Sequence, residues 1–171
     1  MSKIATLTMN PALDLSGSAR RFAEGRKTRC GEQTREPGGG GINVARGIHG
    51  LGGDPLAIYP AGGASGDELE GLIARGAIPQ QRIAIAGSTR ENLSVREVST
   101  GKSFHFVFSG PELTEEEWGR CLRIVNDFEP VPDYLVLSGS LPPGVPEDFY
   151  ARVARAATER GTRVVLDTSG P

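Results

Sequence analysis

The sequence predicts a layered α/β domain built on a mostly parallel sheet, with a small β-sheet lid at its edge. Short apolar runs typical of buried strands alternate with segments whose apolar residues recur at helical spacing. A polar segment at about 13–36 and a strand-like hairpin at about 92–108 interrupt this alternation. Alternation of this kind favours helices on both faces of a parallel sheet, so the interrupting segments are best placed outside that sheet, as the lid.

Length and composition fit one folded domain and argue against several other classes of protein. The 171 residues, 37% of them hydrophobic, are enough for one sizeable core. A net charge of −2 shows no overall bias towards nucleic acid or acidic membranes, and no apolar run is long enough to span a bilayer. The N-terminus lacks the apolar core of a signal peptide, so we expect a cytoplasmic protein. Cys30 and Cys121 have no CxxC spacing, and we expect buried or half-buried thiols.

The first strand is expected over Lys3–Met9, where apolar residues and threonines favour β-structure before an Asn-Pro turn. The polar segment that follows, dense in arginine, is expected to form short exposed strands or loop. Pro37 and the glycine run Gly38–Gly41 then break the chain just before a helix. The apolar stripe expected on that helix consists of Ile42, Ala45, Ile48 and Leu51.

A second strand and a second helix follow in the same way. Leu56–Tyr59 is a buried-type strand. Ser65 and Glu68 have the spacing of a capping box, which predicts the start of a helix there, and Gly76 can close it. A short strand is expected at 83–85.

The rest of the chain begins with a hairpin, whose arms 92–98 and 104–108 alternate apolar and polar residues. Thr114 and Glu117 repeat the capping-box spacing and predict a third helix, which two prolines end. The remaining elements are expected to be a strand at 134–137, a helix at 147–160 and a strand at 163–166.

Three features lie where an α/β domain can place binding groups. The glycine run, followed at once by a helix and Asn43, suits sugar hydroxyls or an anion, although it could also be a flexible loop. Asp14 can reach over the edge of the sheet, but a lone aspartate in a loop is more often a turn residue. Arg90 can hold a phosphate by a two-pronged contact, although surface arginines are common.

The spacing of glycines and histidines argues against the common nucleotide-binding and metal-binding motifs. A dinucleotide fingerprint would need glycine at Asn43 or Val44, and Gly101-Lys-Ser103 is no P-loop, because Arg96 stands where its first glycine belongs. A nicotinamide-dependent oxidoreductase is therefore disfavoured. The two histidines have no partners at metal-ligand spacing, so no metal site is expected.

Four motifs occur in a distinctive order and spacing along the chain. They are Thr8-Met-Asn-Pro-Ala-Leu-Asp14, Gly38-Gly-Gly-Gly-Ile-Asn-Val-Ala45, Thr89-Arg-Glu-Asn92 and Ser138-Gly-Ser-Leu-Pro-Pro-Gly144. Together they resemble the phosphofructokinase branch of the PfkB, or ribokinase-like, sugar kinases. The resemblance covers essentially the whole chain.

The resemblance implies a three-layer α/β/α domain with a small β-sheet lid that often forms a dimer contact, so a homodimer through the lid is expected. It also implies that the family transfers the γ-phosphoryl of MgATP to a sugar hydroxymethyl group. The residues that it implies at the substrate are Asp14, Gly39, Gly40, Asn43, Arg90 and Ser140, with Lys27 and Arg29 as further contacts from the lid.

The resemblance also distinguishes between substrates, because 1-phosphofructokinases and tagatose-6-phosphate kinases usually carry lysine where this chain has Gly40. An all-glycine motif is similar to that of the minor bacterial 6-phosphofructokinases, which favours fructose 6-phosphate as the substrate, with the other two activities as alternatives. Members of the family are nearly twice this length, so the chain is expected to be an N-terminal portion.

Two hypotheses for the function of this chain follow, one enzymatic and one non-catalytic. The catalytic base and most of the ATP pocket of the family lie in the part that this chain lacks, and no residue here is nominated as the base. One alternative is therefore a portion of a sugar-phosphate kinase that is inactive alone. The other is a non-catalytic module that binds sugar phosphate or dimerises.

Overall fold

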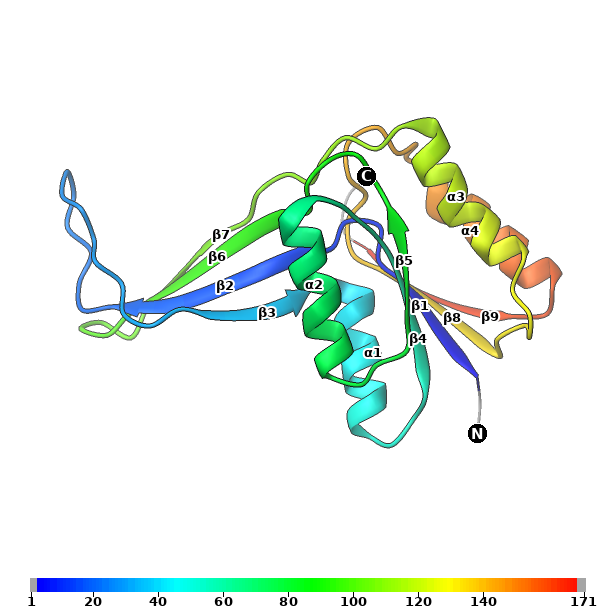
Figure 1. Ribbon diagram of the computed structural model, residues 1–171, viewed down its shortest axis with the longest axis horizontal. Coiled ribbons are helices and arrows are strands. Elements are labelled where there is room, and N and C mark those ends of the chain that lie inside the picture. The colour runs from blue at the N-terminus through cyan, green and yellow to red at the C-terminus, as the bar shows by residue number, and fades with distance from the viewer. Residues whose placement is uncertain (1–2, 169–171) are drawn as a thin grey trace.

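A computed structural model describes residues 3–168 and shows a body built on a five-stranded parallel sheet (Figure 1). The strands lie side by side in the order β5-β4-β1-β8-β9. Their bounds are β1 (Ile4–Leu7), β4 (Pro55–Ala61), β5 (Gln80–Ala84), β8 (Tyr134–Ser138) and β9 (Arg163–Asp167). Helices cover both faces of this sheet, which confirms the predicted three-layer α/β/α arrangement.

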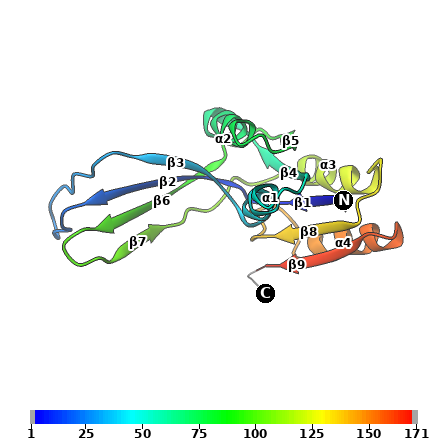
Figure 2. The same ribbon diagram turned by 90° about the horizontal axis from the view of Figure 1, so that it is seen from below.

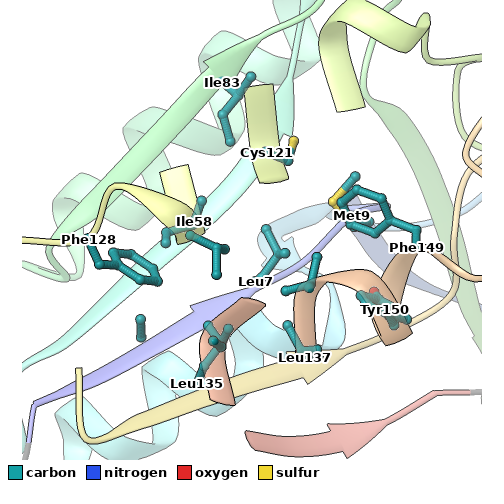
Figure 3. Close-up of a cluster of buried hydrophobic side chains, with 14 of the residues drawn as sticks. Leu7, Met9, Ile58, Ile83, Cys121, Phe128, Leu135, Leu137, Phe149 and Tyr150 are labelled. Atoms are coloured by element: carbon teal, nitrogen blue, oxygen red, sulfur yellow. The ribbon is translucent and has the colours of Figure 1, made fainter. Parts of the chain in front are cut away.

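Two hydrophobic cores hold the helices against the sheet. One face carries α1 (Gly40–Gly50) and α2 (Gly63–Arg75), and the other carries α3 (Glu115–Asn126) and α4 (Phe149–Glu159). The larger core lies under α3 and α4, where Leu7, Leu135 and Leu137 of the central strands are fully buried (Figure 3). Strands that are covered on both faces are expected to be almost continuously apolar, as these are. In the described part of the chain, no helix combines the length and apolar character needed to cross a membrane.

A second sheet, a single layer thick, extends away from one side of the body (Figure 2). It consists of β2 (Ala12–Ala19), β3 (Thr34–Gly38), β6 (Arg90–Glu97) and β7 (Ser103–Phe106), in the order β3-β2-β6-β7. This four-stranded sheet is called the lid below. Its central pair is parallel although the two strands come from distant parts of the chain, with Ala12 opposite Arg90 and Asp14 opposite Asn92.

The lid is joined to the body by side chains as well as by the chain itself. Arg35 on β3 forms an ion pair with Glu68 on α2 at 2.5 Å. Arg46 on α1 lies 4.0 Å from Glu36 on β3. These contacts brace the base of the lid against α1 and α2.

Three local predictions were wrong. α2 begins at Gly63, and the Ser65 hydroxyl donates to the carbonyl of Thr89 at 2.6 Å, so Ser65 and Glu68 form no capping box. Leu51 lies beyond the end of α1 and is 91% exposed, because the helix stops one residue earlier than its apolar stripe suggested. Cys30 is exposed on the lid, whereas Cys121 is buried as expected, and burial raises the pKa of its thiol to about 12.

The capping box predicted for the third helix is confirmed, and it does more than cap. The Glu117 carboxylate accepts hydrogen bonds from Thr114 N at 2.8 Å and from Ala86 N, in the loop after β5, at 2.7 Å. Burial alone would raise the pKa of Glu117, but these hydrogen bonds outweigh it and hold the pKa below its usual value of 4.5. One carboxylate therefore ties α3 to the edge of the sheet.

We predict that Glu117→Ala lowers the free energy of unfolding at pH 7 by about 2 kcal/mol, because it removes a cap and a charged acceptor. Glu116→Ala, which removes an exposed carboxylate one residue earlier, should change it by less than about 0.5 kcal/mol. Since the folded pKa of Glu117 is depressed, its contribution is complete above the unfolded pKa and is lost as the pH falls through the folded value. Urea denaturation of both variants over a series of falling pH values measures this; a gap between them that does not narrow as the pH falls would contradict it.

Candidate functional site

The candidate site lies where the order of strands in the body sheet reverses. β1 has β4 on one side and β8 on the other, and the loops that follow β1 and β8 both leave this central position. Ligands of open α/β sheets bind in the crevice at such a point. The loop after β1 leads into the lid, and the loop after β8 carries the Ser138–Gly144 motif.

The glycine run packs against both of these loops. A Cβ placed on Gly40 would lie 2.2 Å from Ser138 Oγ, and one placed on Gly41 would lie 2.6 Å from Thr8 Oγ1. Gly39 has a φ of +120°, a conformation that side chains rarely adopt. Packing therefore requires glycine at these positions whether or not a ligand binds.

The same close approach shapes the N-terminus of α1. The first N–H groups of a helix have no partner within it. Here the buried Thr8 hydroxyl accepts from Ile42 N at 2.9 Å, so the end of β1 supplies a cap from outside the helix. Nothing in the local sequence near Ile42 pointed to Thr8, because the two residues are 34 positions apart.

Arg90 is the cation at the junction of lid and body. Its Nη2 donates to the carbonyl of Asn10 at 2.9 Å, and its Nη1 donates to the carbonyl of Phe108 at 3.0 Å. Its Nε is buried and has no partner among the described residues. A guanidinium has five N–H donors, so each terminal nitrogen keeps one N–H that makes no hydrogen bond to the described residues.

The surroundings of Arg90 keep it charged and partly enclosed. Burial lowers the pKa of Arg90, and the Asp14 carboxylate partly offsets this, but the guanidinium stays protonated at neutral pH. It lines a cavity of about 730 Å³ together with Asn10 and Ser140. The structure thus brings together two of the predicted substrate residues, Arg90 and Ser140.

Asn10 is a polar residue of this cavity that sequence reasoning took only as part of a turn. Its Nδ2 donates to Ser140 Oγ at 3.3 Å, so it links the loops after β1 and β8. Its Oδ1 is buried and has no partner among the described residues. The sequence signal that could have indicated this role is the position of Asn10 in the first of the four motifs, two residues after the buried Thr8.

Asp14 lies on the lid, on the same face as Arg90. Ala12 is opposite Arg90 and Asp14 is opposite Asn92, and residues two apart on a strand point to the same face. Asn92 Nδ2 donates to Asp14 Oδ1 at 2.9 Å. Asp14 lines a groove of about 330 Å³, and the other charged or polar residues of its lining include Asn92, Glu36 and His105. This groove adjoins the larger cavity, since Val107 lines both.

The other predicted substrate residues lie elsewhere. Gly39, Gly40 and Asn43 line neither cavity, and the exposed Asn43 side chain is 3.4 Å from Arg46 Nη1. Lys27 and Arg29 are exposed on the β2–β3 connection at the far end of the lid (Figure 1). Contacts of these residues with a substrate remain predictions. Among residues 3–168, no cluster of three His, Cys, Asp or Glu side chains could hold a metal ion.

Comparison with known proteins gives a consistent result. The sequence profile described as "pfkB family carbohydrate kinase" matches residues 7–171. The chain is 46% identical over 168 residues to the ATP-dependent 6-phosphofructokinase isozyme 2 of Mycobacterium tuberculosis, covering 98% of this chain and 50% of that protein. It is 41% identical to the Escherichia coli protein of the same name, covering 99% of this chain and 55% of the relative. The chain therefore spans about half the length of the curated relatives it matches.

A solved structure agrees with these relatives. The crystal structure of phosphofructokinase-2 from Escherichia coli in complex with fructose-6-phosphate superposes with a TM-score of 0.94 at 40% identity, covering 99% of this chain and 56% of that one.

We predict that Gly40→Ala lowers the free energy of unfolding by about 2 kcal/mol, because the added methyl group would collide with Ser138. The matched control is Gly47→Ala in the same helix, where nothing lies within 4 Å of the added Cβ. It should raise stability by about 1 kcal/mol through helix propensity. Thermal and urea denaturation measure both; equal effects of the two substitutions would show that the close approach at Gly40 is not a constraint.

Proposed function

The chain belongs to the pfkB family of carbohydrate kinases, and we propose that it supplies the sugar-phosphate site of an ATP-dependent kinase acting on fructose 6-phosphate to give fructose 1,6-bisphosphate. The observation that carries the proposal is the pairing of Arg90 and Asp14 on one face of the lid. A partly buried guanidinium with free donors suits a phosphate, and a carboxylate suits sugar hydroxyls. The phosphorylated end of the sugar is assigned to Arg90 and its hydroxyls to Asp14.

The choice of sugar rests on the glycine run and on relatives. Curated relatives from two bacteria are named 6-phosphofructokinases, at 46% and 41% identity. A tagatose-6-phosphate kinase of Staphylococcus epidermidis is 33% identical, so that activity and 1-phosphofructokinase activity stay as alternatives. The all-glycine motif that includes Gly40 favours fructose 6-phosphate, because it is similar to that of the minor bacterial 6-phosphofructokinases.

The residues of this chain bind and orient rather than react. Asn10 and Ser140 can complete the wall around a phosphate at Arg90, since both line the same cavity. ATP with Mg²⁺ is the proposed phosphoryl donor. The described residues offer no acidic cluster for the metal, so we derive no catalytic step from them. Sugar phosphates and ATP are metabolites of the cytoplasm, where we propose that the protein acts.

The lid is proposed to join two copies of the chain. Phe104, Phe106, Val107 and Phe108, on β7 and just after it, are between 38% and 69% exposed. Apolar side chains gathered on a thin sheet are typical of a surface that another subunit covers. A non-catalytic module that binds sugar phosphate or dimerises is the second candidate function, and the apolar lid is what favours it.

We predict that the 171-residue chain binds fructose 6-phosphate weakly and more tightly than fructose, as measured by NMR titration. Arg90→Lys should weaken this binding at least tenfold, because lysine keeps the charge but cannot donate to Asn10, Phe108 and a phosphate together. Arg35→Lys, at an exposed arginine on the lid, should leave the binding unchanged.

The same chain should release no ADP from MgATP in the presence of fructose 6-phosphate. We assign no residue of the chain as the general base, and such a base typically contributes about 10²–10⁴-fold to the rate. A coupled assay measures this. Turnover typical of sugar kinases would show that the chain holds a base after all and would overturn this assignment of roles.

We predict that Phe106→Glu converts a dimer to a monomer in sedimentation, because a charge on the lid cannot be buried between subunits. Leu51→Glu is the matched control, since Leu51 is an exposed apolar residue at the end of α1, away from the lid. It should leave the dimer intact. A wild-type chain that sediments as a monomer at about 50 μM would contradict the lid interface, since dimers that bury a standard-sized interface commonly bind more tightly than this.

A further inference from the structure

The backbone of Phe108, just beyond the end of β7, is held by two side chains of β6. β7 ends at Phe106, so the peptide groups that follow leave the ladder of the sheet. The carbonyl of Phe108 accepts from Arg90 Nη1 at 3.0 Å, and the N–H of Phe108 donates to Asn92 Oδ1 at 3.3 Å. Side chains two residues apart on one strand thus replace the hydrogen bonds that a longer strand would have made.

The same contact fixes the orientation of the Asn92 amide. An N–H group can bond only to the oxygen of an amide, so the Phe108 N–H directs Oδ1 towards itself. Nδ2 then points to Asp14 Oδ1, to which it donates at 2.9 Å. Both halves of the Asn92 side chain are therefore used within the lid.

Asp14 is confined on its other side as well. A Cβ placed on Gly38 would lie 2.2 Å from Asp14 Oδ2, so the carboxylate occupies the space that a side chain at 38 would fill. With Asn92 on one oxygen and the backbone of Gly38 beside the other, the carboxylate has little freedom to turn. Its remaining lone pairs are the ones available to a ligand.

We infer that Asn92 is a positioning residue, which sets the carboxylate of Asp14 relative to the guanidinium of Arg90 and so selects ligands that carry both hydroxyls and a phosphate. This inference rests on the proposed function of the site. The path is continuous through the backbone of Phe108: Asn92 donates to Asp14 and accepts from the Phe108 N–H, and Arg90 donates to the Phe108 carbonyl. In this proposal Asn92 neither contacts the phosphate nor takes up a proton, and it acts only by orienting Asp14.

The separation that this arrangement sets suits a small phosphorylated sugar. Asp14 and Arg90 belong to adjacent strands and to neighbouring same-face positions, two residues apart in register. At about 3.3 Å per residue along a strand and about 4.8 Å between strands, their Cα atoms are about 8 Å apart. Side chains that converge from this distance can grip the two ends of a sugar phosphate, whereas inorganic phosphate needs Arg90 alone.

The experiment compares two ligands on the intact chain. The measured quantity is the preference, the Kd for inorganic phosphate divided by the Kd for fructose 6-phosphate, determined by NMR titration. In Asn92→Ala the preference should fall about tenfold or more, which is the usual effect of losing a hydrogen bond to a charged group. The Kd for inorganic phosphate should stay within about twofold, since Arg90 keeps its bond to Asn10.

Glu91→Ala is the matched control, because this exposed residue is adjacent on β6 and points to the opposite face. It should leave the preference unchanged. Should Asn92→Ala unfold the lid, Asn92→Asp replaces it; the isosteric carboxylate keeps the acceptor for Phe108 N but repels Asp14, and the preference should again fall.

The outcomes separate the two proposals. A wild-type chain that prefers fructose 6-phosphate, with variants at Asn92 that keep this preference, overturns the role of Asn92 and leaves the proposed function standing. Equal weakening of both ligands in Asn92→Ala also overturns it, since a purely structural residue would act in that way. A wild-type chain with no preference for the sugar phosphate overturns the proposed function and this inference together.

Discussion

The partly buried guanidinium of Arg90 links the loop after the central strand of the body sheet to the end of a lid strand. Arg90 begins the lid strand β6, yet its side chain bonds the carbonyl of Asn10, which follows the central strand of the body, and the carbonyl of Phe108, which follows β7. These acceptors are 80 and 18 residues away. Because both are backbone atoms, they fix the cation in place whatever side chains surround it. The cavity and the placing of its walls depend on this junction.

The glycine run shows how packing and binding can require the same residues. Its members bring α1 close to the loops after β1 and β8, and a side chain at Gly40 or Gly41 would collide with Ser138 or Thr8. A helix that begins so close to the switch point presents N–H groups there. Glycine at these positions is thus explained by the fold alone, and a function for them needs separate evidence. Arg90 differs, since each of its terminal nitrogens keeps an N–H group beyond those that bond the carbonyls of Asn10 and Phe108.

The lid combines two surfaces of opposite character. One face carries Asp14, Asn92 and Arg90, which hold one another through hydrogen bonds or charge. The strand at its edge exposes phenylalanines, among them Phe106. A sheet only one layer thick cannot bury both faces by itself, because it has no core of its own. Polar recognition on one face and association on the other are consistent uses of such a sheet.

The sequence by itself determined the alternation of strands and helices, the capping box at Thr114 and Glu117, and the identity of Asp14, Arg90 and Ser140 as candidates, because these signals are local or belong to motifs. It misplaced the start of α2, since the Ser65 hydroxyl has a better acceptor in Thr89, a residue 24 positions away. The roles of Asn10 and Asn92 became visible only in the fold. Each depends on a partner 78 or more residues distant, and spacing along a chain carries no information about hydrogen bonds that only the pairing of distant strands and loops creates.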